Sequence, residues 1–282
     1  MGIAARDLAA GQGPSRALAT VALDPARARG LARWNAALAV LHFAQFVLMI
    51  AVSRTEAAFT ASVSYVVPRL EAGRFVGLDT RATDIVDIPL AYFVASFFLM
   101  SATAHFLLRW PLRARYEGWL ARGMNPARWV EYAFSSTVMI LAIAQLSFIK
   151  EFSALVAIAG CNVSMNLFGW SMEAANEGRV RADWKHFLFG CIAGIVPWIA
   201  IGASLVAYAV QPDATPIPAF VWAIYGSLFI AFNVFAITMV LQYAKVGRWR
   251  EYLTGEKTYM IMSLVAKSLL AWQVWSGTLR PM

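Results

Sequence analysis

Five ionisable side chains lie within long apolar stretches of the sequence, where charged groups are rare. They are His42, His105, Glu131, Glu173 and Lys267. A charged residue near the centre of a membrane helix costs about 2.5 to 3.5 kcal/mol on insertion scales, so each of these residues is a candidate functional group. Their chemical types suit a buried ion pair, a proton relay or, for the lysine, a Schiff base. The set therefore indicates a polar site inside a membrane domain.

Lys267 and Glu131 are the two charges placed to form the centre of this site. Lys267 lies about eight residues into its apolar stretch, roughly 12 Å at 1.5 Å per residue, which is too deep for its amine to reach water easily. Such a lysine either pairs with a carboxylate or forms a covalent product such as a Schiff base. Glu131 is the available carboxylate because both stretches begin on the same side of the membrane. Two interpretations stay open: an ion pair that only fixes helix packing, and a pair that takes part in function.

Other polar groups surround this pair by helical spacing. Ser263 precedes Lys267 by four residues and shares its helix face, so its hydroxyl can reach the lysine nitrogen; a small residue there also allows close helix packing. His42 and His105 lie on the same side as Glu131, which favours a hydrated polar cavity that can share a proton. Glu173 ends its apolar stretch, which predicts either an interfacial position or the entrance to that cavity.

The elements that must position these groups are membrane helices. The chain has 282 residues, of which 60% are hydrophobic and 14% charged, and its mean hydropathy is +0.59. Soluble domains are about half apolar and a quarter charged. Stretches of about 20 apolar residues, the length that spans a bilayer, occur at 34–52, 88–108, 129–149, 152–172, 187–210, 220–243 and 259–279. The sequence therefore predicts an all-α membrane protein, a bundle of seven transmembrane helices, and excludes a large soluble domain.

Turn-forming residues separate the predicted helices. Asn125 before Pro126 predicts a helix start, and the proline-rich segment 211–218 predicts a loop. Only Lys150 and Glu151 separate the third and fourth helices, so the turn must be very tight or the helix ends must unwind. The one long loop, 53–87, contains two short strand-like runs at 62–67 and 74–78, which predicts a small β-hairpin over the outer face.

Charge asymmetry predicts the orientation. Of the 24 Lys and Arg residues, seventeen lie in the N-terminal segment and the loops on its side, six lie on the opposite side, and Lys267 is inside a helix. By the positive-inside rule the N-terminus is cytoplasmic and the C-terminus extracellular. Residues 1–33 are expected to be a cytoplasmic tail and 34–282 the transmembrane domain. The net charge of +8 then requires no nucleic-acid partner.

The sequence carries no sign of an enzyme or of a metal site. Cys161 and Cys191 both lie in apolar stretches, which predicts buried thiols and neither a disulfide framework nor a metal centre. No zinc-protease, phosphate-loop or hydrolase motif occurs. We therefore expect a protein that is not an enzyme.

Three segments together resemble the heliorhodopsin family of microbial retinal proteins: SLVAKSLLAWQV at 263–274, WVEYAFSS at 129–136 and LHFAQ at 41–45. The likeness runs over all seven helices. It implies that the seven-helix bundle is of the rhodopsin type. It also implies a light-sensing protein of the cell membrane that binds all-trans retinal and has its N-terminus in the cytoplasm, opposite to other microbial rhodopsins. In this family pattern Lys267 is the Schiff-base lysine, Glu131 its counterion, Ser263 a neighbour of the Schiff base, and His42 and His105 belong to the polar cavity.

The resemblance also places residues around the chromophore and implies partners. The expected pocket residues are Asn162, Met165, Gly169, Pro197 and Phe232, with Trp272, an aromatic near the middle of the seventh helix, beside them. The family is similar in forming homodimers, and its best-known members do not pump ions, although some viral relatives conduct protons. These properties imply photosensory signalling through an unidentified cytoplasmic partner.

Two alternatives to signalling stay open. One is a light-driven proton pump or channel, and the other is a membrane transporter that uses Lys267 and Glu131 to bind its substrate. Net proton transport is disfavoured because residues 132–149 and 268–279, which lead outward from the central pair, contain no Asp, Glu or His.

Overall fold

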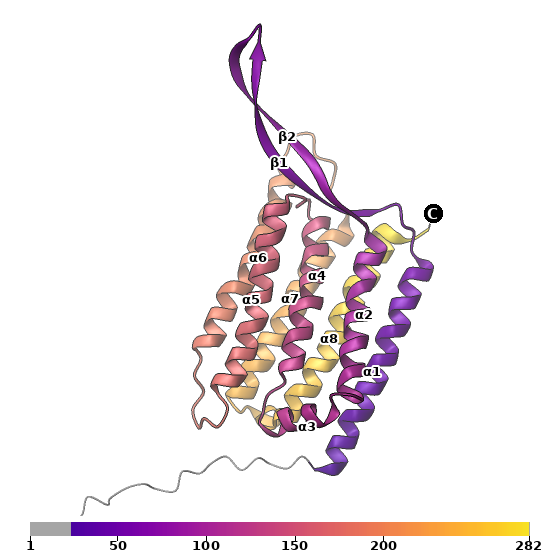
Figure 1. Ribbon diagram of the computed structural model, residues 1–282, viewed down its shortest axis with the longest axis vertical. Coiled ribbons are helices and arrows are strands. Elements are labelled where there is room, and N and C mark those ends of the chain that lie inside the picture. The colour runs from indigo at the N-terminus through magenta and orange to yellow at the C-terminus, as the bar shows by residue number, and fades with distance from the viewer. Residues whose placement is uncertain (1–23, 282) are drawn as a thin grey trace, which may run out of the picture.

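Seven long helices run side by side in the computed structural model, which describes residues 24–281 (Figure 1). They are α1 (Pro25–Val52), α2 (Leu90–Arg109), α4 (Pro126–Leu146), α5 (Phe152–Ala175), α6 (Lys185–Ala209), α7 (Ala219–Tyr243) and α8 (Tyr252–Val274). A short helix, α3 (Arg113–Ala121), and a 3-10 turn, η1 (Gly247–Arg250), lie at one end of the bundle, here called the α3 end. A β-hairpin rises from the opposite end, called the hairpin end. The predicted seven-helix bundle is confirmed.

Among the described residues, six of these helices are long and apolar enough to cross a membrane. The seventh, α8, has a similar length of 23 residues. Its hydropathy is lower because Lys267 and Gln273 lie within it. Lys267, which lowers the hydropathy of α8, is also the candidate functional residue of that helix.

Several helix boundaries differ from the predicted ones for identifiable reasons. Helix α1 begins at Pro25, because the Asp24 side chain accepts a hydrogen bond from the backbone N–H of Ala26 at 3.1 Å and caps the helix. Residues 25–33 are thus helical, and the rest of the predicted tail, 1–23, lies outside the described residues. Helix α8 begins at Tyr252, before the predicted apolar stretch, and ends in a π-helical turn, Trp275–Leu279.

The predicted turns between helices are confirmed. Asn125 caps α4 by accepting a hydrogen bond from the backbone N–H of Arg128 at 3.2 Å. The proline-rich loop 211–218 separates α6 from α7. Helix α4 unwinds after Leu146, and Phe148 takes a positive φ of 69° to make the turn toward α5.

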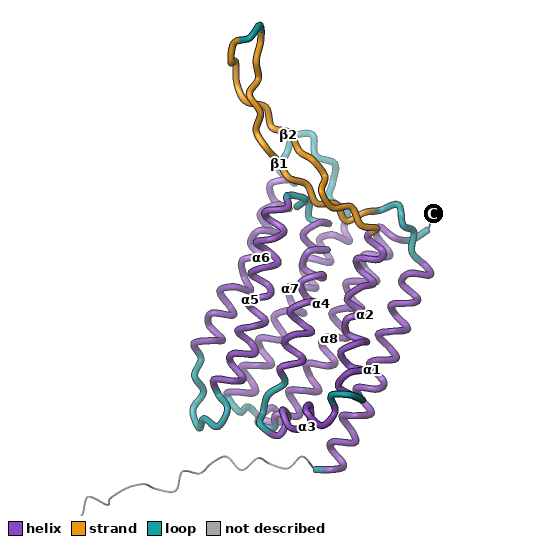
Figure 2. The backbone as a smooth tube through the Cα atoms, viewed as in Figure 1, coloured by secondary structure: helices purple, strands orange, loops and turns teal. Residues whose placement is uncertain are grey.

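The hairpin is confirmed, but its strands are longer than predicted. Strand β1 (Ala58–Glu71) pairs antiparallel with β2 (Arg74–Pro89). The second half of β2 was not predicted because it contains the polar residues Asp84 and Asp87, which are uncommon in strands. In the structure they accept hydrogen bonds across the hairpin from Ser62 at 2.6 Å and Thr60 at 3.2 Å. Figure 2 shows the distal half of the hairpin extending away from the bundle.

The core of the bundle combines large apolar side chains with small residues that let helices approach closely. Ala91 and Ala95 of α2, Ala142 of α4 and Ala271 of α8 are fully buried. The prediction of two buried thiols is wrong for Cys191, which is exposed on α6, whereas Cys161 is half-buried. Membrane helices expose apolar residues to lipid, so an apolar neighbourhood in the sequence does not indicate burial in the protein.

Candidate functional site

Lys267 and Glu131 form an ion pair in the middle of the bundle. The Lys267 Nζ atom lies 3.3 Å from Oε1 of Glu131, and the two side chains are 3% and 9% exposed. Lys267 is the sixteenth residue of α8, about 22 Å along its axis at 1.5 Å per residue. Because α8 begins earlier than predicted, the amine is deeper than the sequence indicated. An ionised pair at this depth is held by its mutual charge and its hydrogen bonds.

Hydroxyl and aromatic groups complete the surroundings of the pair. Nζ of Lys267 donates a hydrogen bond to the Ser263 hydroxyl at 2.6 Å, as the four-residue spacing predicted. The Ser101 hydroxyl donates to Oε1 of Glu131 at 2.6 Å. The face of Tyr132 lies 5.3 Å from the lysine nitrogen, a position in which an aromatic ring stabilises a cation. Ser101 and Tyr132 were missed because neither is charged and helical spacing alone does not relate α2 to α4.

His42 and His105 lie together, as expected for a polar cavity. Their rings stack at a centroid distance of 5.7 Å. The Nδ1 atom of His105 shares a hydrogen bond of 2.8 Å with Oδ1 of Asn35. Both ring nitrogens of the fully buried His42 lack a partner among the described residues. Buried polar atoms of this kind are commonly satisfied by ordered water.

An apolar cavity of about 370 Å³ leads away from Lys267 between α4, α5, α6 and α7. This volume is within the range of about 300 to 1,000 Å³ typical of small-molecule sites. Of the predicted pocket residues, Met165, Gly169 and Phe232 line it. Lining residues that the sequence did not single out are Trp129, Tyr132, Met139, Asn166, His186, Phe187, Gly190, Cys191, Gly194, Ile195, Phe229, Phe235, Ala236 and Met239.

Three predicted pocket residues lie outside the cavity wall. Asn162 points instead to the Ser136 hydroxyl, to which it donates at 2.8 Å, and Asn166, one turn further along α5, lines the cavity. Pro197 is buried in α6, and its neighbour Trp198 takes the lining position. Trp272 faces α1, where its Nε1–H lies 3.4 Å from Oε1 of Gln45. A shift of one turn separates Asn162 from the lining residue Asn166, and a shift of one residue separates Pro197 from Trp198.

The size and chemistry of the cavity fit retinal. The cavity walls are mainly aromatic and aliphatic, and the primary amine of Lys267 is among the groups that line it. Gly169 lies flat against the Trp129 indole, and a Cβ atom at this position would overlap the ring. The glycine therefore lets the indole close the wall of the cavity. A polyene with a terminal aldehyde matches both the apolar walls and the amine.

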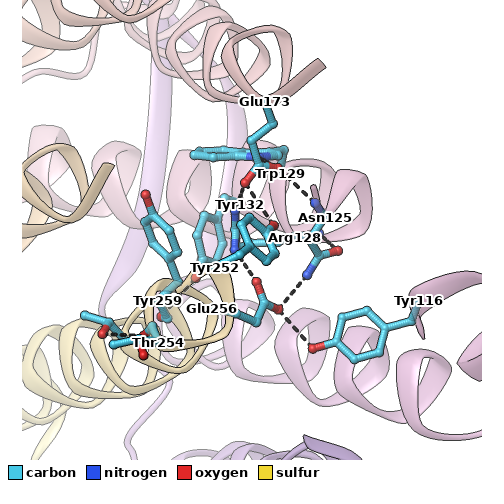
Figure 3. A network of polar contacts seen from close by, with 11 residues as sticks. Tyr116, Asn125, Arg128, Trp129, Tyr132, Glu173, Tyr252, Thr254, Glu256 and Tyr259 are labelled. Carbon is cyan, nitrogen blue, oxygen red and sulfur yellow. Dashed lines mark hydrogen bonds and ion pairs between the residues drawn. The ribbon is translucent and has the colours of Figure 1, made fainter. Parts of the chain in front are cut away.

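A second buried charge cluster lies toward the α3 end, and the sequence did not predict it (Figure 3). Arg128 of α4 forms ion pairs with Glu173 of α5 and Glu256 of α8, all nearly fully buried. The hydroxyls of Tyr252 and Tyr116 each donate at 3.0 Å, to Glu173 and Glu256 respectively. Burial raises the pKa of Tyr116, which lies on α3, well above its usual value, so it stays a donor at physiological pH.

The structure places Glu173 in this cluster. Its carboxylate pairs with Arg128 inside the protein, and it makes no hydrogen bond to His42 or His105 among the described residues. It is 2% exposed and accepts hydrogen bonds from the backbone N–H of Asn125 at 2.9 Å and the indole N–H of Trp129 at 2.7 Å. Arg128 was counted as a loop charge because it precedes the apolar stretch 129–149. It lies three residues after the predicted cap, Asn125, which already places it in the first turn of α4 and was the available signal.

A family model described as Heliorhodopsin matches residues 31–279, which is most of the chain. No individual curated protein matches.

Proposed function

Because this chain belongs to the heliorhodopsin family, whose members bind retinal and sense light, we propose that it is a photosensory protein in which Lys267 carries all-trans retinal as a Schiff base and Glu131 is the counterion. The observation that carries the proposal is the buried amine of Lys267. It lines the apolar cavity and lies 3.3 Å from a carboxylate.

The cavity residues select and hold the chromophore. Condensation of the Lys267 amine with the retinal aldehyde forms a C=N bond and releases water. Bound retinal supplies absorption of visible light and a light-driven change of shape. Apolar side chains of α5, α6 and α7 exclude water along the cavity, which protects the C=N bond from hydrolysis.

The groups around the lysine control its proton. Glu131 compensates the positive charge of a protonated Schiff base, and Ser101 holds that carboxylate in position. Ser263 accepts a hydrogen bond from the lysine nitrogen. When the bond between nitrogen and counterion weakens, the proton has acceptors on one side, in the cavity that contains His42 and His105.

Toward the hairpin end, titratable acceptors are missing from the two helices that form the site. Residues 132–146 of α4 and 268–274 of α8 contain no Asp, Glu or His. Polar Gln145 and Ser147 are present there and have side-chain oxygens without partners among the described residues. A proton released from the site therefore returns by the way it left, which favours signalling without net ion transport over a proton pump or channel.

The surrounding assembly follows from the charge distribution and the family. We place the α3 end in the cytoplasm because most loop arginines and lysines lie there. The protein then sits in the cell membrane as a homodimer and acts on a cytoplasmic partner.

The test is reconstitution with all-trans retinal followed by a single flash. The purified protein should acquire a visible absorption band, lose it in hydroxylamine, and show a flash-induced absorption change that decays back to the dark state. A protein that stays colourless contradicts the proposal and favours a transporter that uses Lys267 and Glu131 to bind its substrate.

A further inference from the structure

Trp129 belongs both to the cavity and to the charge cluster at the α3 end. One part of its indole lines the cavity wall. The indole N–H donates to Oε2 of Glu173 at 2.7 Å (Figure 3). The proposed photochemistry at Lys267 does not require this bond, so its role is open.

The indole has little freedom to move without breaking that bond. Its six-membered ring lies against Gly169, where even a Cβ atom has no room. The rings of Tyr132 and Tyr259 meet it edge to face at centroid distances of 6.2 and 6.0 Å. The Arg128 guanidinium lies 4.9 Å from the ring centre. Close packing of this kind transmits displacement instead of absorbing it.

Glu173, the acceptor of the indole N–H, is the first member of a connected chain of charged groups. Its other oxygen, Oε1, pairs with Arg128, which also pairs with Glu256. Glu256 accepts the Tyr116 hydroxyl at 3.0 Å. Tyr116 is buried on the inner face of α3, whereas the neighbouring Arg115 is exposed. This series of contacts therefore leads from the cavity wall to α3, on the surface of the α3 end.

We propose that Trp129 is a positioning residue that transmits a change in cavity shape to α3. Displacement of the indole breaks its hydrogen bond to Glu173, the carboxylate shifts relative to Arg128, and the altered cluster releases Tyr116. This inference rests on the proposed function and names how the same site regulates the surface that a cytoplasmic partner meets. A buried charge left without its partner is costly, so a shift of the Glu173 carboxylate forces the groups paired with it to move as well.

A spin label on α3 tests the proposal. The label is attached through Arg115→Cys in a protein whose Cys161 and Cys191 are replaced by alanine. Trp129→Phe keeps an aromatic ring but removes the N–H donor. Trp170→Phe is the matched control. Trp170 lies near Glu173 at the same end of α5 and is 37% exposed. A second variant, Tyr116→Phe, removes the last hydrogen bond of the chain and leaves the cavity wall intact.

Two measurements are made on each variant. In the retinal-free protein, the label should be more mobile in Trp129→Phe than in the parent or in Trp170→Phe. With retinal bound, light should change the label spectrum in the parent and in Trp170→Phe. That change should fall at least tenfold in Trp129→Phe and in Tyr116→Phe, while Tyr116→Phe and Trp170→Phe, whose altered residues lie outside the cavity wall, keep a flash-induced absorption change. If Trp129 only stabilised the fold, Tyr116→Phe would keep the light-dependent change of the label spectrum.

The outcomes separate this inference from the proposed function. A parent that photocycles without a light-dependent label signal overturns the transmission to α3, and so does an unchanged signal in both variants. If Trp129→Phe does not fold, Tyr116→Phe decides by the same criterion. A parent that forms no pigment contradicts the proposed function instead, and the retinal-free comparison still tests the link between Trp129 and α3.

Discussion

Glu131 has Lys267 as its one ion-pair partner within residues 24–281, and the pair is shielded from water. A fixed negative charge beside a protonated Schiff base localises the positive charge at the nitrogen. The electronic properties of the chromophore and the stability of the apoprotein therefore both depend on this carboxylate.

Glu131→Gln removes the charge and keeps the shape of the side chain. The protonated pigment should absorb at longer wavelength than the wild type, because its positive charge then spreads along the polyene. In the retinal-free protein, loss of one partner of a buried pair should lower the free energy of unfolding by about 3 to 5 kcal/mol. Glu117→Gln, which affects a half-exposed pair with Arg113 on α3, is the control and should change neither the spectrum nor the stability appreciably. An unshifted spectrum in Glu131→Gln would remove Glu131 from the counterion role.

Residue chemistry could be predicted where a charge stands alone in an apolar stretch or where helical spacing relates two residues. Lys267 and Ser263 are four residues apart, and Glu131 is the available carboxylate, so the sequence brought these three together. Ser101 lies on another helix, α2, and Trp129 lies two residues before Glu131 on α4. Their contacts depend on how each helix is rotated about its axis, which one sequence does not reveal. Asn162 and Pro197 missed the cavity wall for the same reason.

At the scale of elements, the hairpin is held to the bundle through Glu151, which lies between α4 and α5. Its carboxylate accepts hydrogen bonds from the Ser64 hydroxyl at 2.7 Å and the Ser64 backbone N–H at 3.2 Å. These bonds, the hydroxyl first, hold the pKa of the exposed Glu151 below its usual value. The contact therefore favours the ionised carboxylate.

This contact predicts a pH-dependent hairpin. Because the pKa of Glu151 is lowered in the folded protein, its stabilisation is present above the unfolded pKa of about 4.3 and is lost as the pH falls through the folded value. A spin label placed at Val66→Cys should gain mobility when the pH is lowered below about 4. The same label in Glu151→Gln should show no such pH step. A step of equal size in Glu151→Gln would assign the pH response to another group.

Helix existence was easier to predict than helix ends. The apolar stretches located all seven long helices, yet α1 and α8 each begin with a polar turn that hydropathy assigned to a loop. Arg128, Glu173 and Glu256 escaped prediction as a cluster because they lie in such terminal turns. Their burial depends on how three helix ends converge, which is a property of the tertiary structure.

At the scale of the whole molecule, the charge distribution predicts which end faces the cytoplasm. An impermeant label should react on intact cells with a cysteine introduced at Val66 of the hairpin and not with one introduced at Arg115 of α3. Both measurements use the protein without its native cysteines. Labelling of the α3 position alone would reverse the orientation.

The one-sided distribution of titratable groups predicts that light moves no net proton across the membrane. Cells or proteoliposomes that contain the pigment should show no sustained light-dependent change of external pH and no steady photocurrent. A pH change abolished by a protonophore would identify a pump. A photocurrent that reverses with voltage would identify a channel. Either result would contradict signalling without net ion transport.

Chemical reduction of the pigment tests whether retinal is covalently attached to Lys267. Borohydride treatment of the reconstituted pigment converts a C=N bond to a stable amine, after which the protein is digested and its peptides are analysed by mass spectrometry. One retinyl group should be found, located on Lys267, and none in Lys267→Ala, which should fold but stay colourless. A retinyl group on another lysine, or a coloured Lys267→Ala protein without added amine, would contradict this attachment.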